Sequence, residues 1–176
     1  MNTCKNCKTE YKPEQTNCVT CRYPLGGSED EQAVFVANQV LQKSYVSGSI
    51  ERLKKARNIL FVLGGFHAVF AFVPAFNPSI IDTGLNLFFG ILFGSFGFLT
   101  YRNPKIALLV PLIFMSCYYL ILIMFEPLLL FSGIIWKILI LTGLGYGYFS
   151  VRKSDKILKE NEYLASLLGF NRITNK

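Results

Sequence analysis

Four of the chain's five cysteines lie within its first 21 residues, and their spacing is that of a metal site. They form two C-x2-C pairs, Cys4 with Cys7 and Cys18 with Cys21, separated by ten residues. A C-x2-C pair makes a tight turn that presents two sulfur atoms to one ion, and two such turns complete a tetrahedral shell. Because a closed shell leaves no open position for water or substrate, the pattern predicts a structural metal site and not a catalytic one.

The ion that this set of ligands predicts is zinc. A C-x2-C pair can also perform thiol redox chemistry, but that function is typical of a βαβ context, which is absent around these cysteines. The spacing resembles the short zinc ribbons at the N-termini of many small, multi-pass prokaryotic membrane proteins, and the resemblance covers residues 1–27. Such ribbons usually have a glycine with positive φ after each pair, whereas this chain has Lys8 and Arg22.

A segment as short as residues 1–27 cannot bury a useful apolar core. Zinc-finger peptides gain about 10–16 kcal/mol from their metal, so we expect the ion to supply the folding free energy of this segment. Without metal, the segment is expected to be disordered.

The composition of the chain as a whole is that of a membrane protein. Hydrophobic residues make up 52% of the 176 residues, charged residues 16%, and the mean hydropathy is +0.38. A soluble protein this apolar would have too little polar surface to cover itself. The net charge of +7 could suggest a nucleic-acid partner, but the basic residues cluster at the ends of apolar segments, which indicates a membrane-topology signal instead.

Four apolar segments are each long enough to cross a hydrocarbon core of about 30 Å. Asn, Asp, Glu and Pro residues separate them, and only Lys137 interrupts the fourth. The sequence therefore predicts a mainly α integral membrane protein, a four-transmembrane-helix bundle with a small N-terminal Cys4 zinc ribbon. The four segments are residues 58–81, 83–101, 106–125 and 127–151.

The expected organisation has four parts. A zinc ribbon at 1–27 precedes an amphipathic helical linker at 28–56, a transmembrane domain at 57–151 and a tail helix at 152–176. Ser28 and Glu31 form a capping-box pattern at the start of the linker helix.

We expect the linker helix to break near Ser47-Gly48-Ser49. Its apolar stripe could pack within this protein, lie in the headgroup plane or pair with a partner helix. After Val151 a separate charged helix is expected.

The distribution of Lys and Arg predicts the orientation. Basic residues occur before the first span, between the second and third spans and after the fourth, whereas the other two connections contain none. Both termini are therefore predicted to be cytoplasmic, where thiolates persist as metal ligands and structural disulfides are rare. The resemblance to prokaryotic proteins implies the cell inner (cytoplasmic) membrane. Tyr101 and Tyr146 fall where aromatic anchors are expected at the interface.

Two polar residues within the spans, His67 and Lys137, could carry a function. His67 lies near the middle of the first span, either as a functional ionisable group or as a neutral ring with one interhelical hydrogen bond. Lys137 is expected to reach the outer surface beside Trp136 if the fourth span begins near Ile134. If the span begins at Pro127, the Lys137 ammonium would lie near the midplane and need a partner. Cys117 is interpreted as a small core residue. Gly and Ala residues recur at intervals that favour close helix packing, within the chain or between copies of it.

No catalytic motif is present, so an enzyme is not expected. A polar, mildly basic ribbon face suggests docking to a protein partner or to lipid, more than to nucleic acid. Its residues are Lys5, Asn6, Lys8, Lys12, Arg22 and Tyr23. The sequence thus predicts a non-enzymatic membrane protein whose cytosolic ribbon is a docking or regulatory module for a membrane complex. The alternatives are a small permease or pore for a neutral or apolar solute, and nucleic-acid sensing at the membrane.

Overall fold

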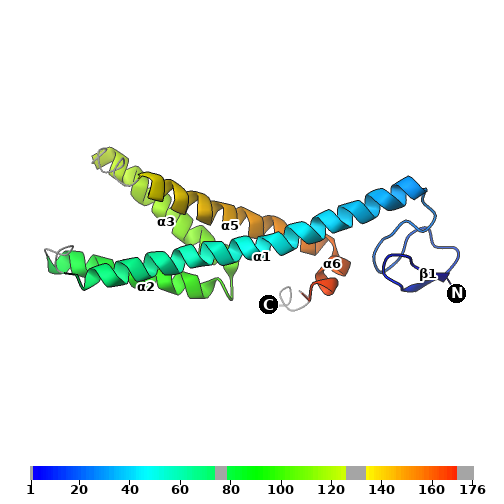
Figure 1. Ribbon diagram of the computed structural model, residues 1–176, viewed down its shortest axis with the longest axis horizontal. Coiled ribbons are helices and arrows are strands. Elements are labelled where there is room, and N and C mark those ends of the chain that lie inside the picture. Colours follow the sequence, from blue (N-terminus) through cyan, green and yellow to red (C-terminus); the bar gives the residue numbers. More distant parts are fainter. Residues whose placement is uncertain (1, 74–78, 126–133, 170–176) are drawn as a thin grey trace. The chain divides into compact units, whose positions relative to one another are not determined.

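The computed structural model describes residues 2–73, 79–125 and 134–169, and it is mainly helical (Figure 1). The chain divides into two compact units. The described parts of Met1–Gly48 and Ser154–Lys176 form the cysteine unit, and those of Ser49–Lys153 form the helical unit. The elements are β1 (Asn2–Thr3), β2 (Glu10–Tyr11), α1 (Glu29–Ala71), α2 (Ile80–Leu99), α3 (Pro104–Phe125), α5 (Ile134–Glu160) and α6 (Glu162–Leu167).

The predicted capping box at the start of α1 is confirmed. The Ser28 hydroxyl accepts a hydrogen bond from the Glu31 backbone N–H at 3.3 Å, and the Glu31 carboxylate accepts one from the Ser28 backbone N–H at 3.0 Å. Glu29 and Asp30 add negative charge to the first turn, where the helix dipole favours it.

The predicted break of the linker helix is wrong, because α1 runs without interruption from Glu29 to Ala71. Ser49 is buried at 4% exposure and Val46 at 0%, so packing on both sides of Gly48 holds this turn in the helix. A glycine in a helix costs only about 1 kcal/mol relative to alanine, which such packing can offset. The boundary between the two units nevertheless falls between Gly48 and Ser49.

In the helical unit, small residues bring helix backbones into direct contact. A Cβ added at Gly64 of α1 would lie 2.9 Å from the backbone nitrogen of Gly94 in α2, and one added at Gly90 would lie 3.1 Å from the backbone nitrogen of Ala68. On α5, a Cβ at Gly147 would lie 2.6 Å from the Ala56 Cβ. These glycines therefore serve packing within the chain.

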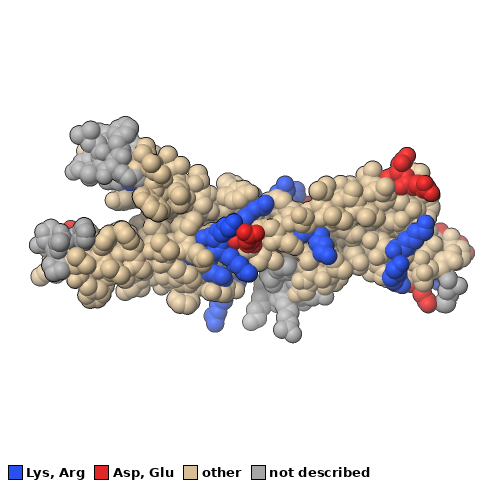
Figure 2. Space-filling view, in the orientation of Figure 1, with Lys and Arg blue, Asp and Glu red and all other residues tan. Residues whose placement is uncertain are grey.

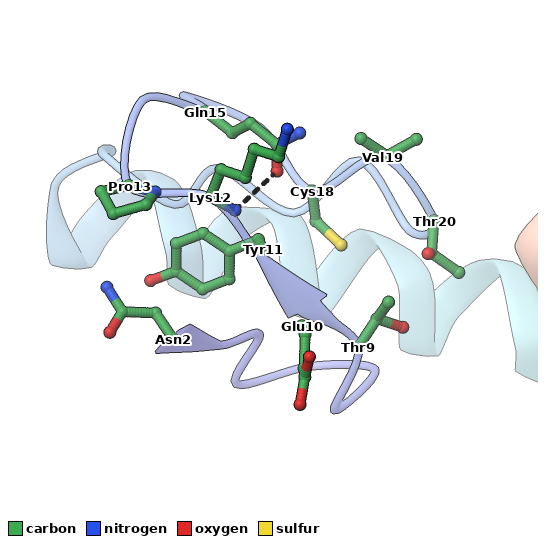
Figure 3. A pocket seen from close by; sticks show the side chains of 10 residues that line it. All are labelled: Asn2, Thr9, Glu10, Tyr11, Lys12, Pro13, Gln15, Cys18, Val19 and Thr20. Atoms are coloured by element: carbon green, nitrogen blue, oxygen red, sulfur yellow. Dashed lines mark hydrogen bonds between the residues drawn. The ribbon is translucent and has the colours of Figure 1, made fainter.

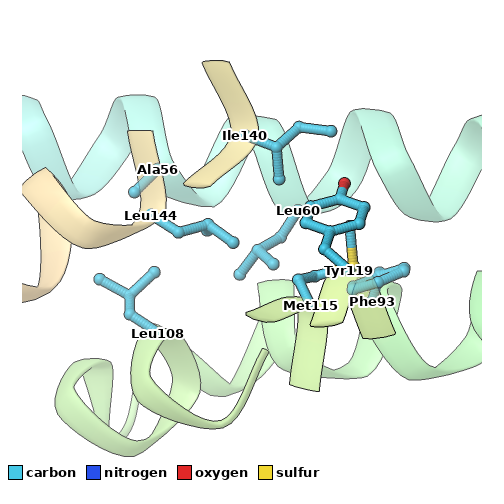
Figure 4. Packing of buried hydrophobic residues seen from close by; sticks show 8 residues of the cluster. All are labelled: Ala56, Leu60, Phe93, Leu108, Met115, Tyr119, Ile140 and Leu144. Carbon is cyan, nitrogen blue, oxygen red and sulfur yellow. The ribbon is translucent and has the colours of Figure 1, made fainter. Parts of the chain in front are cut away.

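The core of the helical unit receives side chains from all four of its helices (Figure 4). Leu60, Leu108 and Leu144 have no exposed surface, and Phe93 is 1% exposed. Burial of a side chain of this size stabilises a fold by about 1.5–3 kcal/mol in water. The cluster consists of Ala56, Leu60, Phe93, Leu108, Met115, Tyr119, Ile140 and Leu144.

The interpretation of Cys117 as a core residue is wrong, because its side chain is exposed. The buried face of α3 carries Pro111, Met115 and Tyr119, which recur every four residues. Cys117 lies midway between two members of that series and therefore on the opposite side of the helix.

The predicted separate tail helix begins later than expected. α5 continues past Val151 to Glu160, and a short second helix, α6, follows. The i,i+4 pairs Lys156–Glu160 and Lys159–Asp155, at 3.7 and 3.3 Å, occur on this extension of α5. Asn161 caps α6 by accepting a hydrogen bond from the Leu164 backbone N–H at 3.0 Å.

Within the described residues, three helices are long and apolar enough to cross a membrane, namely α2, α3 and α5. The first predicted span is not among them. The uncharged stretch of α1 that follows Arg57 ends with the helix at Ala71, so it is about 21 Å long at 1.5 Å per residue. Part of the remainder of that predicted span, residues 74–78, lies outside the described residues, as does the beginning of the fourth predicted span, residues 127–133.

Candidate metal centre

Two backbone turns of matching geometry carry the four N-terminal cysteines. In the first, the Lys8 N–H donates to the Cys4 carbonyl at 3.0 Å, and the Cys4 N–H donates to the Thr9 carbonyl at 2.9 Å. The second turn repeats this pattern with Arg22, Cys18 and Tyr23 at 2.8 and 2.9 Å. The short antiparallel pairing of β1 with β2, with Thr3 opposite Glu10, holds the first turn in place.

The residue that follows each C-x2-C pair has the left-handed backbone conformation. Lys8 has φ 62° and Arg22 has φ 61°, and they are the non-glycine residues with positive φ in the described part of the chain. This is the conformation for which ribbons use glycine, and for a residue with a Cβ it costs about 1–2 kcal/mol. The two turns are therefore retained in spite of local backbone strain.

The four sulfur atoms are grouped as a single metal ion would need them. All lie within 4.8 Å of one another, with Cys4 Sγ 3.7 Å from Cys21 Sγ and Cys7 Sγ 3.5 Å from Cys18 Sγ. All four cysteines are free, so no disulfide accounts for the short distances. A tetrahedron with metal–sulfur bonds of about 2.3 Å has sulfur atoms about 3.8 Å apart. The cluster could hold one metal ion.

The surroundings of the sulfur atoms shift the pKa values of Cys7 and Cys21 in opposite directions. Burial acts to raise the pKa of Cys7, but hydrogen bonds with the Thr9 side chain and backbone, and with Cys21 and Cys18, outweigh it and lower the pKa to about 6. Burial is the main reason why the pKa of Cys21 is raised to about 12. Thiolates this close repel one another, and a bound cation removes that repulsion.

Side chains from α1 and from the segment after α5 cover the cluster. Tyr23 is 5% exposed and packs edge-on against Phe35 of α1, with ring centroids 5.7 Å apart. Tyr163 of α6 packs against the cysteines as well. Burial is the main reason why the pKa of Tyr163 is raised, and the nearby thiolates raise it further. The prediction that Tyr23 belongs to an exposed face is therefore wrong, because its ring forms part of the core under the sulfur atoms.

Amide side chains connect the same parts of the cysteine unit. The Asn6 amide donates to Gln39 Oε1 of α1 at 2.8 Å, and the Asn161 amide donates to Gln42 Oε1 at 3.1 Å. The Tyr23 hydroxyl donates to Gln32 Oε1 at 2.8 Å. The apolar stripe expected on the linker helix, which includes Val36, Val40 and Leu41, is exposed, so the interpretation that this stripe packs within the protein is not supported. The side of α1 that packs against the cysteines carries Phe35 instead. Gln32, Gln39 and Gln42 are spaced along one side of α1, and this spacing was a sequence signal that could have identified the side of the helix that packs in the cysteine unit.

A hollow of about 470 Å³ opens on the outer surface of the cysteine unit (Figure 3). More apolar than polar surface lines it, and its lining residues include Tyr11, Pro13 and Val19, of which Val19 is 80% exposed. Lys12 projects from its rim, and the Gln15 side chain accepts a hydrogen bond from the Lys12 backbone N–H at 3.2 Å. Except for Cys18, the sulfur ligands do not line this hollow.

The two ionisable residues singled out within the spans have neighbours in the helical unit. His67 Nδ1 lies 2.9 Å from Asn86 Oδ1 of α2, and the imidazole ring packs near Phe89 and Phe93. This is the interhelical hydrogen bond expected of a structural histidine. Lys137 Nζ lies 5.9 Å from the centroid of the Tyr119 ring of α3.

Comparisons of the chain with protein-family models, with curated proteins and with solved structures found no match.

Proposed function

We propose that this chain is a non-enzymatic membrane protein of the cell inner membrane whose zinc-bound cysteine unit docks a protein partner on the cytoplasmic side. The observation that carries the proposal is the closed thiolate cluster, which is buried on one side by Tyr23 and Tyr163 and adjoins an open hollow on the other.

Zinc is the ion that we propose for the four sulfur atoms. The sulfur spacing is compatible with a tetrahedral shell, and zinc imposes no other geometric preference on thiolate ligands. Cys4, Cys7, Cys18 and Cys21 would each supply one bond, so water and substrate would have no coordination position. The bound ion would hold the two strained turns together and give the surface above them a fixed shape.

Membrane insertion through four helices is part of the proposal. The apolar helices α2, α3 and α5 support three spans, and the Gly64–Gly94 contact supports packing of α1 beside α2 along the same segment. With four spans, every loop that carries Lys or Arg faces the same side, which the positive-inside rule assigns to the cytoplasm. The His67–Asn86 hydrogen bond then satisfies two polar groups inside the bundle.

The partner site that we propose is the hollow lined by Tyr11, Lys12, Val19 and Thr20. A hollow whose lining is mainly apolar but also offers hydrogen-bonding groups is suited to a polypeptide segment, which supplies both kinds of group. The side chains offer no row of aromatic rings on which nucleobases could stack, which argues against nucleic acid.

Site-specific crosslinking in intact cells tests this proposal. A photoreactive amino acid at Val19 should capture a protein partner, whereas the same amino acid at Val34, which is 60% exposed on α1, should not. Adding Cys18→Ser to the Val19 variant should abolish capture, because the hollow loses its metal-dependent shape. Equal capture from both positions would contradict docking at the hollow, and capture that survives Cys18→Ser would contradict the role of the metal.

A further inference from the structure

The helical unit carries a concentration of basic side chains at one end of its apolar helices. A band of Lys and Arg side chains crosses α1 near the turn between α2 and α3 (Figure 2). Glu51 is the single carboxylate in the same sequence segments, 49–57, 100–105 and 150–153. We call this band the basic collar, and its members are Arg52, Lys54, Lys55, Arg57, Arg102, Lys105, Arg152 and Lys153.

Contacts place the three parts of the basic collar at the same level. Arg57 of α1 lies over the ring of Tyr101, with its Cζ 4.1 Å from the ring centroid, which joins α1 to the α2–α3 turn. Arg52 donates a hydrogen bond to the Ser150 hydroxyl at 3.0 Å, which joins α1 to α5. The Arg52 guanidinium also lies 5.0 Å from the centroid of the Tyr146 ring. The collar is therefore one surface made by three segments far apart in the sequence.

Four of the eight basic side chains of the collar have no ion-pair partner among the described residues. Lys55 forms an ion pair with Glu51 at 2.9 Å. Across the described residues 2–73, 79–125 and 134–169, no carboxylate lies within ion-pair distance of Lys54, Arg57, Arg102 or Arg152. A guanidinium that stacks on an aromatic ring keeps its N–H groups at its edge, where they can donate to an oxyanion.

We propose that the basic collar binds the phosphodiester headgroups of anionic phospholipids. The collar lies where α2 ends and α3 begins, which is the boundary of two apolar helices. At such a boundary the adjoining anions are lipid phosphates, and arginine pairs with phosphate through two parallel hydrogen bonds. Tyr101 and Tyr146 supply the amphipathic rings typical of this depth. The proposal rests on the membrane insertion proposed above, and it is independent of the partner of the cysteine unit.

Thermal unfolding of the purified, zinc-loaded protein in a neutral detergent tests the inference. Added phosphatidylglycerol should raise the unfolding temperature by several degrees, whereas phosphatidylcholine with the same acyl chains should not. Inorganic phosphate at the same concentration should have no effect. A shift with inorganic phosphate would show that the collar recognises a soluble anion and would overturn the assignment to lipid, as would equal shifts with the two lipids.

Two triple variants locate the effect. Arg57→Gln, Arg102→Gln and Arg152→Gln together should remove most of the phosphatidylglycerol shift. Lys43→Gln, Lys156→Gln and Lys159→Gln together remove the same charge from the cysteine unit and should leave the shift unchanged. Equal loss in both variants would overturn the collar as the site.

If the first variant does not fold, the wild-type protein provides the measurement. Raising the salt from about 0.1 to about 1 M shortens the Debye length from about 10 to about 3 Å and should weaken the phosphatidylglycerol shift several-fold. A shift that does not depend on salt would contradict recognition by charge. Membrane insertion is checked separately by whether extraction from cell membranes requires detergent, so that failure of the lipid preference and failure of the insertion are distinguishable.

Discussion

The candidate metal centre combines residues with unfavourable individual properties, which one bound ion would stabilise together. Lys8 and Arg22 have left-handed backbone, and the thiols of Cys7 and Cys21 have pKa values shifted in opposite directions. The left-handed backbone and the raised pKa of Cys21 are both unfavourable for a closed, ionised cluster. A divalent cation bound there would compensate for both, because it would need the turns closed and the thiols ionised.

Replacing a strained residue by glycine should stabilise the cysteine unit. Lys8→Gly or Arg22→Gly removes the clash of a Cβ in left-handed backbone, with an expected gain of about 1 kcal/mol, partly offset by the greater freedom of glycine in the unfolded chain. Lys8→Val should destabilise it, since a β-branched residue tolerates this conformation least. The zinc affinity of each variant, measured by competition with a chelator, would report both effects. Lys5→Gly, at a position with negative φ, is the control and should weaken binding slightly, and a weakening of similar size in Lys8→Gly would contradict the strain.

Acid should release the metal. The pKa of Cys7 is lowered from 9.0 to about 6, so the stabilisation from its thiolate is complete above pH 9 and is lost as the pH falls to about 6. Below that pH, protons compete with zinc for all four sulfur atoms. We expect zinc, followed with a colorimetric indicator, to be retained at pH 7.5 and released between pH 6 and pH 4. Full retention at pH 4 would contradict a site made of thiolates alone.

At the scale of elements, close helix packing in the helical unit depends on glycines at defined positions. Gly64 and Gly65 are neighbours in α1, but only Gly64 faces α2. A Cβ at Gly65 would have no heavy atom within 4 Å, whereas one at Gly64 would meet the backbone of Gly94 at 2.9 Å. Backbone atoms cannot move aside as a flexible side chain can, so the two helices would have to separate.

Gly64→Ala and Gly65→Ala form a matched pair that tests this packing. Overpacking costs about 1–3 kcal/mol, so Gly64→Ala should lower the stability of the protein in detergent by an amount in that range. Gly65→Ala should be neutral or slightly stabilising, since alanine favours helix more than glycine does. Thermal unfolding followed by circular dichroism would measure both. Equal effects of the two substitutions would show that α1 and α2 do not approach at Gly64.

At the scale of the whole molecule, the cysteine unit combines the N-terminal turns with the first half of α1 and with α6. The contacts of Tyr163 with the cysteines and of Asn161 with Gln42 join residues separated by more than a hundred positions in the chain. Metal binding near the N-terminus is therefore expected to order the segment after α5 as well.

Removal of the metal should affect the two units differently. Chelation of the bound ion, or Cys18→Ser, should expose the peptide bonds around residues 2–27 and around α6 to protease and leave residues 79–125 protected. Cys117→Ser is the control, because its exposed thiol lies outside the cluster and the substitution should change nothing. Limited proteolysis with mass spectrometry would identify the cleaved bonds. Cleavage confined to residues 2–27 would show that α6 does not depend on the metal.

The sequence by itself determined those features that depend on neighbours along the chain. The two C-x2-C pairs, the Ser28–Glu31 cap and the left-handed positions at Lys8 and Arg22 are set within a few residues, since each is a matter of local backbone and ligand chemistry. The apolar segments likewise indicated where α2 and α3 lie.

Only the tertiary structure decided which residues meet across the fold. The burial of Tyr23, the contact of Tyr163 with the cysteines and the outward side of Cys117 depend on how helices face one another, and periodicity alone does not specify that. The continuity of α1 through Gly48 is of the same kind, because packing at Val46 and Ser49 outweighs a local preference of about 1 kcal/mol.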